Sequence, residues 1–190
     1  MSNAVIAAGV VAVAVFGFAP QNNAMLTAGA ERTLKPVIDG MIASICSWLL
    51  LFALALGMLH LLPSWASGAA VILAALVLAA SGLTRYMADP GKPWQQAGRA
   101  GLALPLEHLR SVESWAVAFF LAGSALSGSV TLSAAFAGLT LICVSGLCLW
   151  ALAGWSGCQY LTSGWHRRHL DWGFGILMFV AAIAALTPGG

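Results

Sequence analysis

Charged residues are scarce in this sequence. Of its 190 residues, only 7% are Asp, Glu, Lys or Arg, and 61% are hydrophobic. A water-soluble domain carries about 25% charged residues, which keep its surface in water. The scarcity therefore excludes a water-soluble enzyme, and the formal net charge of +2 is too small to indicate nucleic acid as a partner. The composition predicts an all-α integral membrane protein whose partner is the lipid bilayer.

Cysteine and histidine motifs are also missing. The four cysteines lie singly in or beside apolar stretches without a Cys-x-x-Cys pair, so we interpret them as small buried hydrophobic residues. His166 and His169 enclose two arginines that would repel a cation, and we interpret this tract as an interfacial anchor. The sequence therefore predicts no metal site, no cofactor and no enzymatic activity.

Long apolar runs, in contrast, are abundant. A helix needs about 20 apolar residues to cross the hydrocarbon core of a bilayer. Without a basic residue before it, the first run is not expected to be a cleaved signal peptide. The sequence predicts six membrane spans, at residues 4–18, 37–62, 66–86, 111–126, 130–155 and 172–186.

The Lys and Arg residues predict the orientation of these spans. All eight follow the first, third or fifth predicted span or lie close to those connections, and both termini lack them. Because basic connections stay on the cytoplasmic side, we expect an inner-membrane protein with both termini outside.

A polar connector divides the predicted spans into two sets of three. Residues 1–88 form the first predicted three-helix repeat, residues 89–104 a cytoplasmic connector, and residues 105–190 the second repeat. Because three is an odd number, the two halves enter the membrane from opposite sides, which is typical of transporters with inverted repeats. Six spans without any repeat are the alternative.

Pro20, Gln21, Asn22 and Asn23 interrupt the first apolar region. Proline breaks a helix, and broken backbone at membrane depth survives only when it is covered by protein or lines a cavity. The half-helix after the break would point free N–H groups at an anion such as a carboxylate. In the alternative interpretation, Pro20 simply ends the first span and the three amides lie in an aqueous loop.

Two acidic residues are further candidates for a site. Glu113 lies at the entry to the fourth predicted span, three residues after Arg110, and the two could pair on one helical face. Glu113 is a functional candidate if submerged and part of an interfacial collar if not. Asp39 either caps the second span beside Lys35 or binds a substrate amine or a proton. Trp48 and Trp150 lie deeper than an interfacial belt and could line a cavity.

Together these features resemble the lysine exporter superfamily (LysE/RhtB). Residues 17–26, Gly-Phe-Ala-Pro-Gln-Asn-Asn-Ala-Met-Leu, are similar to its helix-breaking segment. Residues 111–116, Ser-Val-Glu-Ser-Trp-Ala, fall where the family usually shows Asn-Pro-Lys-Ala-Trp, so the second Asn-Pro pair is absent. Glu113 stands where a basic residue is common in the family.

The resemblance implies an exporter that moves an amino acid or similar small zwitterion outward by alternating access, driven by the proton gradient. It also suggests a homodimer. The residues implied to bind the substrate are Pro20, Gln21, Asn22 and Asn23, with Glu113 first and Asp39 second as the group that meets the amine or carries the proton.

Three other functions stay open at this point. A divalent metal-ion exporter of the same superfamily would need several carboxylates. A membrane thiol–disulfide conductor would use Cys46 and Cys143. A non-transporting subunit of a membrane complex would use its small-residue faces for packing.

Overall fold

The computed structural model describes residues 3–17, 20–87, 108–158 and 164–186, and every regular element within these ranges is an α-helix, which confirms the predicted all-α class. The helices are α1 (Asn3–Phe16), α2 (Pro20–Ala30), α3 (Leu34–His60), α4 (Trp65–Met87), α6 (Val112–Leu126), α7 (Leu132–Trp155) and α8 (Gly164–Leu186).

Four of these helices are long and apolar enough to cross a membrane, and they fit a multi-pass membrane protein. They are α3, α4, α7 and the part of α8 from Arg168 to Leu186. The bent pair α1 and α2 makes a fifth crossing if the two helices form one span. The 15-residue α6, where the sequence predicts the fourth span, is shorter than a full crossing.

Hydroxyl side chains set the starts of two helices. The side chain of Ser111 accepts a hydrogen bond from the N–H of Ser114 at the start of α6. Thr131 does the same for Ala134 at the start of α7. Each cap satisfies an N–H that has no acceptor within its helix.

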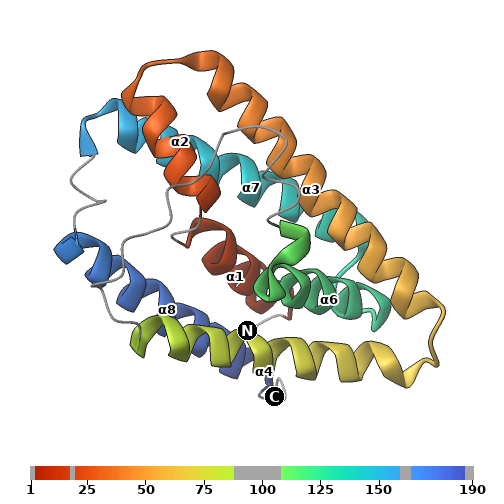
Figure 1. Cartoon of the computed structure of the whole chain (residues 1–190). Helices are drawn as coiled ribbons and strands as arrows, with labels where there is room; N and C mark the ends of the chain where they lie inside the picture. The colour runs from red at the N-terminus through yellow and green to blue at the C-terminus, as the bar shows by residue number, and fades with distance from the viewer. Residues whose placement is uncertain (1–2, 18–19, 88–107, 159–163, 187–190) are drawn as a thin grey trace.

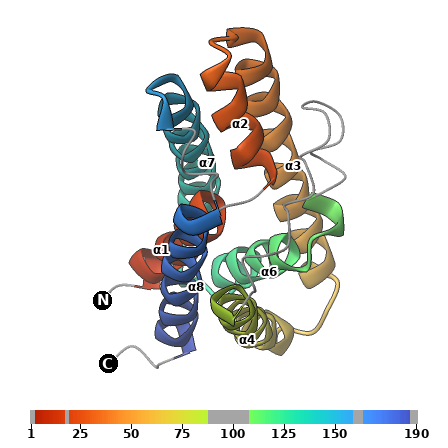
Figure 2. The same cartoon turned by 60° about the vertical axis from the view of Figure 1, so that its left-hand side comes forward.

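Several of the helices pack in pairs (Figures 1 and 2). Helix α4 lies along α8, α2 lies along α7, and α6 contacts both α3 and α4. Helix α6 is short, and of the helices named above only α1 and α2 have fewer residues. Nine of its 15 residues are nevertheless buried. Helix α6 therefore lies in the interior of the bundle.

Glycines bring α4 and α8 into close contact. A Cβ atom added at Gly82 would lie 2.6 Å from the carbonyl oxygen of Gly175, and one added at Gly175 would lie 2.7 Å from that of Gly82. Only residues without side chains let the two backbones approach this closely.

We expect Gly82→Val to destabilise the protein by about 1–3 kcal/mol, because the added atoms must push α8 away. Gly68→Ala is the control within the same helix, since a Cβ atom added at Gly68 would meet nothing within 4 Å. Thermal unfolding in detergent measures both. Equal melting temperatures for the two variants would contradict the packing of α4 against α8.

Candidate functional site

The first apolar region is broken, as its sequence predicts. Helix α1 ends at Phe16, α2 begins at Pro20, and the axes of the two segments differ by 58°. Residues 18 and 19 lie outside the described residues. Gln21 and Asn22 are 3% and 0% exposed, so these two amides are buried in the protein and do not lie in an aqueous loop.

Side chains satisfy the carbonyl groups that α1 leaves open at its end. The Nδ2 atom of Asn22 donates to the carbonyl oxygens of Val15 (2.8 Å) and Gly17 (2.6 Å). The indole N–H of Trp150, from α7, donates to the carbonyl oxygen of Phe16 at 3.1 Å. Because a buried carbonyl without a partner costs free energy, these bonds are what makes an internal helix end tolerable.

A hydrogen-bonded cluster joins α2, α3 and the start of α6. The Oε1 atom of Gln21 accepts from the Ser44 hydroxyl at 2.8 Å and from His108 Nε2 at 2.5 Å. The Nδ1 atom of His108 lies 3.1 Å from the Ser114 hydroxyl. A carboxamide oxygen only accepts, so the proton of the His108 ring is on Nε2, and Ser114 can donate to Nδ1.

Glu113 pairs with Arg85, at the end of α4. Arg85 Nε donates to Glu113 Oε1 at 3.2 Å, and Arg85 Nη2 contacts Glu113 Oε2. The two side chains are 21% and 29% exposed. The pairing with Arg110 that helical spacing allowed is not formed among the described residues, and a tertiary contact that sequence spacing could not reveal supplies the cation instead. Glu107, which precedes Arg110 by three residues in the sequence, lies outside the described residues.

The Arg85–Glu113 pair lies beside the break. A Cβ atom added at Gly17 would be 3.2 Å from Arg85 Nη1, so the guanidinium reaches the last residue before the interruption. The absence of a side chain at Gly17 leaves room for it. One arginine thus contacts both the break and the carboxylate on α6.

Asn23 and Asp39 lie nearer the surface than Gln21 and Asn22. Asn23 is half-buried one residue after Asn22, and Pro20 is the first residue of α2. Asp39 contacts Lys35 at 2.5 Å in the first turns of α3, where their side chains are 52% and 86% exposed. That position fits the interfacial interpretation of Asp39.

Two buried polar atoms have no hydrogen-bond partner among the described residues. They are Oδ1 of Asn22, an acceptor, and Nε1 of Trp48, a donor. The Trp48 ring packs against the His108 ring with their centroids 4.9 Å apart. Since buried polar atoms nearly always have partners, each of these atoms requires an explanation.

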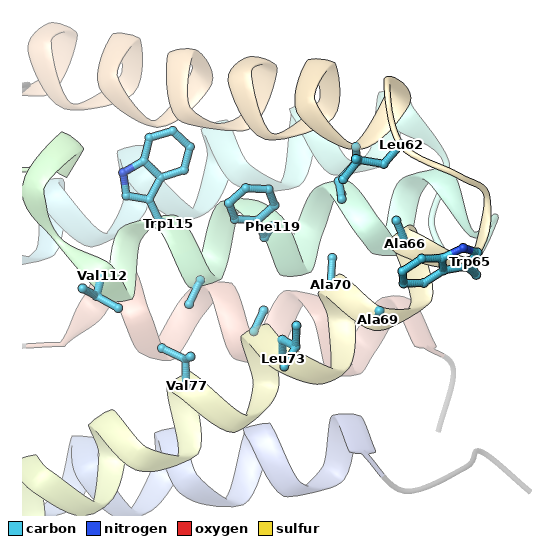
Figure 3. Close-up of a pocket in the computed structure, with 13 residues that line it drawn as sticks. Leu62, Trp65, Ala66, Ala69, Ala70, Leu73, Val77, Val112, Trp115 and Phe119 are labelled. Carbon is cyan, nitrogen blue, oxygen red and sulfur yellow. The ribbon is translucent and has the colours of Figure 1, made fainter.

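An apolar groove of about 430 Å³ lies on the other side of α6, between the end of α3 and α4 (Figure 3). Trp65 lies at one end and Val112 at the other, with Trp115 and Phe119 on α6 between them. Its lining is almost entirely hydrocarbon, and so it offers nothing to orient a charged or zwitterionic molecule. The polar cluster, and not this groove, is the candidate site.

No sequence signal identified His108, Ser44 or Arg85 as parts of the site. Ser44 resembles any other small residue of an apolar helix, and His108 lies in a charged stretch typical of an interface. The signal that could have found them is covariation with Gln21 and Glu113, which a single sequence does not contain.

Comparisons of this chain with protein-family models, curated proteins and solved structures find no match.

Proposed function

We propose that the protein is an inner-membrane exporter of an amino acid or a similar small zwitterion, driven by the proton gradient. The observation that carries this proposal is the break between α1 and α2, where buried amide side chains form a hydrogen-bonded cluster. Two buried polar atoms at this cluster, Asn22 Oδ1 and Trp48 Nε1, have no hydrogen-bond partner among the described residues. Interrupted backbone at membrane depth is tolerated where it is covered by protein or lines a cavity, and transporters place their substrate sites at such interruptions.

The two ends of the break offer different chemistry. The carbonyl groups at the end of α1 are occupied by Asn22 and Trp150. The N–H groups in the first turn of α2 have no acceptor within their helix, and the positive end of the helix dipole favours a carboxylate there. Because both N–H groups of the Asn22 side chain are used, we assign the carboxylate to the backbone of α2 rather than to the Asn22 amide.

Glu113 is the first choice for the group that meets the substrate amine or carries the proton. It lies on α6 and pairs with Arg85 on α4, beside the break. A carboxylate in this position can exchange its arginine partner for an ammonium group or a proton. Asp39 stays the second choice because it is exposed and paired with Lys35.

Alternating access in this proposal uses six spans arranged as two inverted repeats, residues 1–88 and 105–190, with α1 and α2 as one broken span. Two features support this arrangement. Residues 108–110 are helical and Ser111 is extended before α6 begins, so the second half also has an interruption near its start. The reciprocal contact of Gly82 with Gly175 is the pattern that a pseudo-two-fold axis between α4 and α8 would produce.

The proposed orientation places the basic connections in the cytoplasm. The α2–α3 junction, the end of α4 and the start of α8 lie toward the left of Figure 1, and these segments contain Arg32, Lys35, Arg85 and Arg168. The uncharged α3–α4 and α6–α7 junctions lie toward the right. This separation of charge supports cytoplasmic basic connections.

A divalent cation is a less suitable substrate. Within the part of the chain that the structure describes, no three His, Cys, Asp or Glu side chains are grouped so that they could hold a metal ion. Such an ion prefers six or more oxygen ligands, including several carboxylates.

Efflux of a panel of radiolabelled amino acids from cells with and without this chain tests the proposal. We expect the chain to accelerate efflux of at least one neutral amino acid, and a protonophore to abolish that increase. Resistance to excess manganese or cadmium is measured in parallel. Folded, membrane-inserted protein that changes no amino acid efflux would contradict the proposal, and a metal phenotype alone would favour the alternative.

A further inference from the structure

One deeply buried indole N–H group in this protein has no partner among the described residues. Trp48 is 3% exposed, and its Nε1 atom finds no acceptor there. Two other tryptophans behave differently: the buried Trp150 donates to the carbonyl oxygen of Phe16, and the half-buried Trp115 donates to that of Leu109. A buried tryptophan usually finds such a partner, so this N–H group is a donor that a bound ligand could satisfy.

Trp48 belongs to the same cluster as the break. It lies one helical turn after Ser44 on α3, and Ser44 donates to Gln21 at the start of α2. Its ring contacts the ring of His108, which is bonded to Gln21 as well. The unmet donor on Trp48 and the unmet acceptor on Asn22 thus border one group of hydrogen-bonded side chains.

The chemistry of the two side chains and their hydrogen bonds determine which of these two atoms donates and which accepts. Asn22 uses both of its N–H groups on the carbonyls of α1, so only its Oδ1 atom is left, and that atom can only accept. An indole N–H can only donate. A ligand that satisfies both atoms must offer an acceptor to Trp48 and a donor to Asn22.

We propose that Trp48 is a ligand-binding residue, whose indole N–H donates to the carboxylate of the transported zwitterion while Asn22 Oδ1 accepts from its ammonium group. This inference rests on the proposed function and adds the residue that selects for the carboxylate. One carboxylate oxygen then faces the N–H groups of α2 and the other faces Trp48, and because Asn22 meets the ammonium group, Glu113 is left to carry the proton. An α-amino acid carries both groups on one carbon atom, so it offers the acceptor that Trp48 lacks and the donor that Asn22 lacks.

The variant Trp48→Phe tests this inference because it keeps an aromatic ring and removes the N–H. We expect the KM for efflux of the transported amino acid to rise about tenfold, since a hydrogen bond to a charged group is lost. The wild-type protein should prefer the amino acid to its carboxamide analogue, and the variant should lose most of that preference. Its melting temperature without substrate should stay equal to that of wild type or rise, because a buried donor without a partner is gone.

Two matched substitutions separate binding from structure. Trp65→Phe makes the same chemical change at a side chain that is 72% exposed, and it should alter neither KM nor melting temperature. Trp150→Phe removes a donor that holds the end of α1, and it should lower the melting temperature.

The outcomes distinguish this inference from the function on which it rests. If wild type exports an amino acid and Trp48→Phe keeps the same KM and the same preference over the carboxamide, the inference is wrong and the exporter proposal stands. The inference is equally wrong if Trp48→Phe lowers the melting temperature as much as Trp150→Phe does, with no change in preference. If wild type exports no amino acid, both are wrong.

Discussion

Replacing Asn22 with alanine is expected to destabilise the protein by about 3 kcal/mol, the largest effect of any single amide in the site. The side chain donates to the carbonyl oxygens of both Val15 and Gly17 and is fully buried. Its removal would leave two backbone acceptors unsatisfied inside the protein. Each buried acceptor that loses its partner costs about 1–3 kcal/mol.

Asn23→Ala is the matched control for this prediction. Asn23 is the neighbouring amide, half-buried, and its side chain makes no hydrogen bond within the described residues. Thermal and denaturant unfolding of the two purified variants in the same detergent provides the comparison. Similar stabilities for Asn22→Ala and Asn23→Ala would show that Asn22 does not hold the end of α1.

The second large effect is expected at the ion pair between α4 and α6. Arg85→Ala and Glu113→Ala each remove one charge of the pair and leave the other in a mostly buried place, whereas the double variant removes both charges. We therefore expect the double variant to lose about 1–2 kcal/mol less stability than the sum of the losses in the two single variants. This coupling energy is set below that of a fully buried pair because both side chains are partly exposed. Efflux should fall at least tenfold in each single variant, corresponding to about 1.4 kcal/mol.

The exposed pair of Lys35 with Asp39 is the control for that cycle. Its side chains are 86% and 52% exposed, against 21% and 29% for Arg85 and Glu113. Exposed pairs couple by about 0.5 kcal/mol or less when they lie four residues apart on a helix. A coupling energy between Arg85 and Glu113 no larger than that of the exposed pair would contradict the role given to this contact.

Hydropathy and local chemistry were sufficient to predict much of this fold. The apolar runs predicted α3, α4, α7 and α8 because a bilayer demands long uncharged helices. Pro20 and the amides after it predicted the break, since proline and its missing N–H act on the nearest turn of the chain. The role of the short α6 was harder to predict. Its apolar run is visible in the sequence, but 15 residues are too few for a full crossing, so whether this region spans the membrane depends on the residues before α6.

The site was predicted in part. Gln21 and Asn22 could be identified because three amides in a row are unusual in an apolar region. The partner of Gln21 is His108, 87 positions away, and the partner of Glu113 is Arg85, 28 positions away. Helical spacing favoured Arg110 for Glu113, but the arrangement of α4 against α6 decided otherwise. Such contacts come from the packing of helices, which no local pattern contains.

The most direct test of this account asks whether the break lies at membrane depth and yet meets water. A spin label at position 23, in a chain whose four native cysteines are replaced, reports its collisions with oxygen and with a water-soluble nickel complex in lipid vesicles. Labels at Ser64, in the α3–α4 junction, and at Leu76, on the exposed apolar face of α4, provide the aqueous and lipid references.

The account predicts that the label at position 23 collides with the nickel complex far more often than the label at Leu76 does. Depth-specific lipid probes should at the same time place the label at position 23 within the hydrocarbon layer. Addition of the exported amino acid should reduce the collisions with nickel. A label at position 23 that behaves like the one at Ser64, or one that never meets the nickel complex, would contradict the claim that this break forms a transport site.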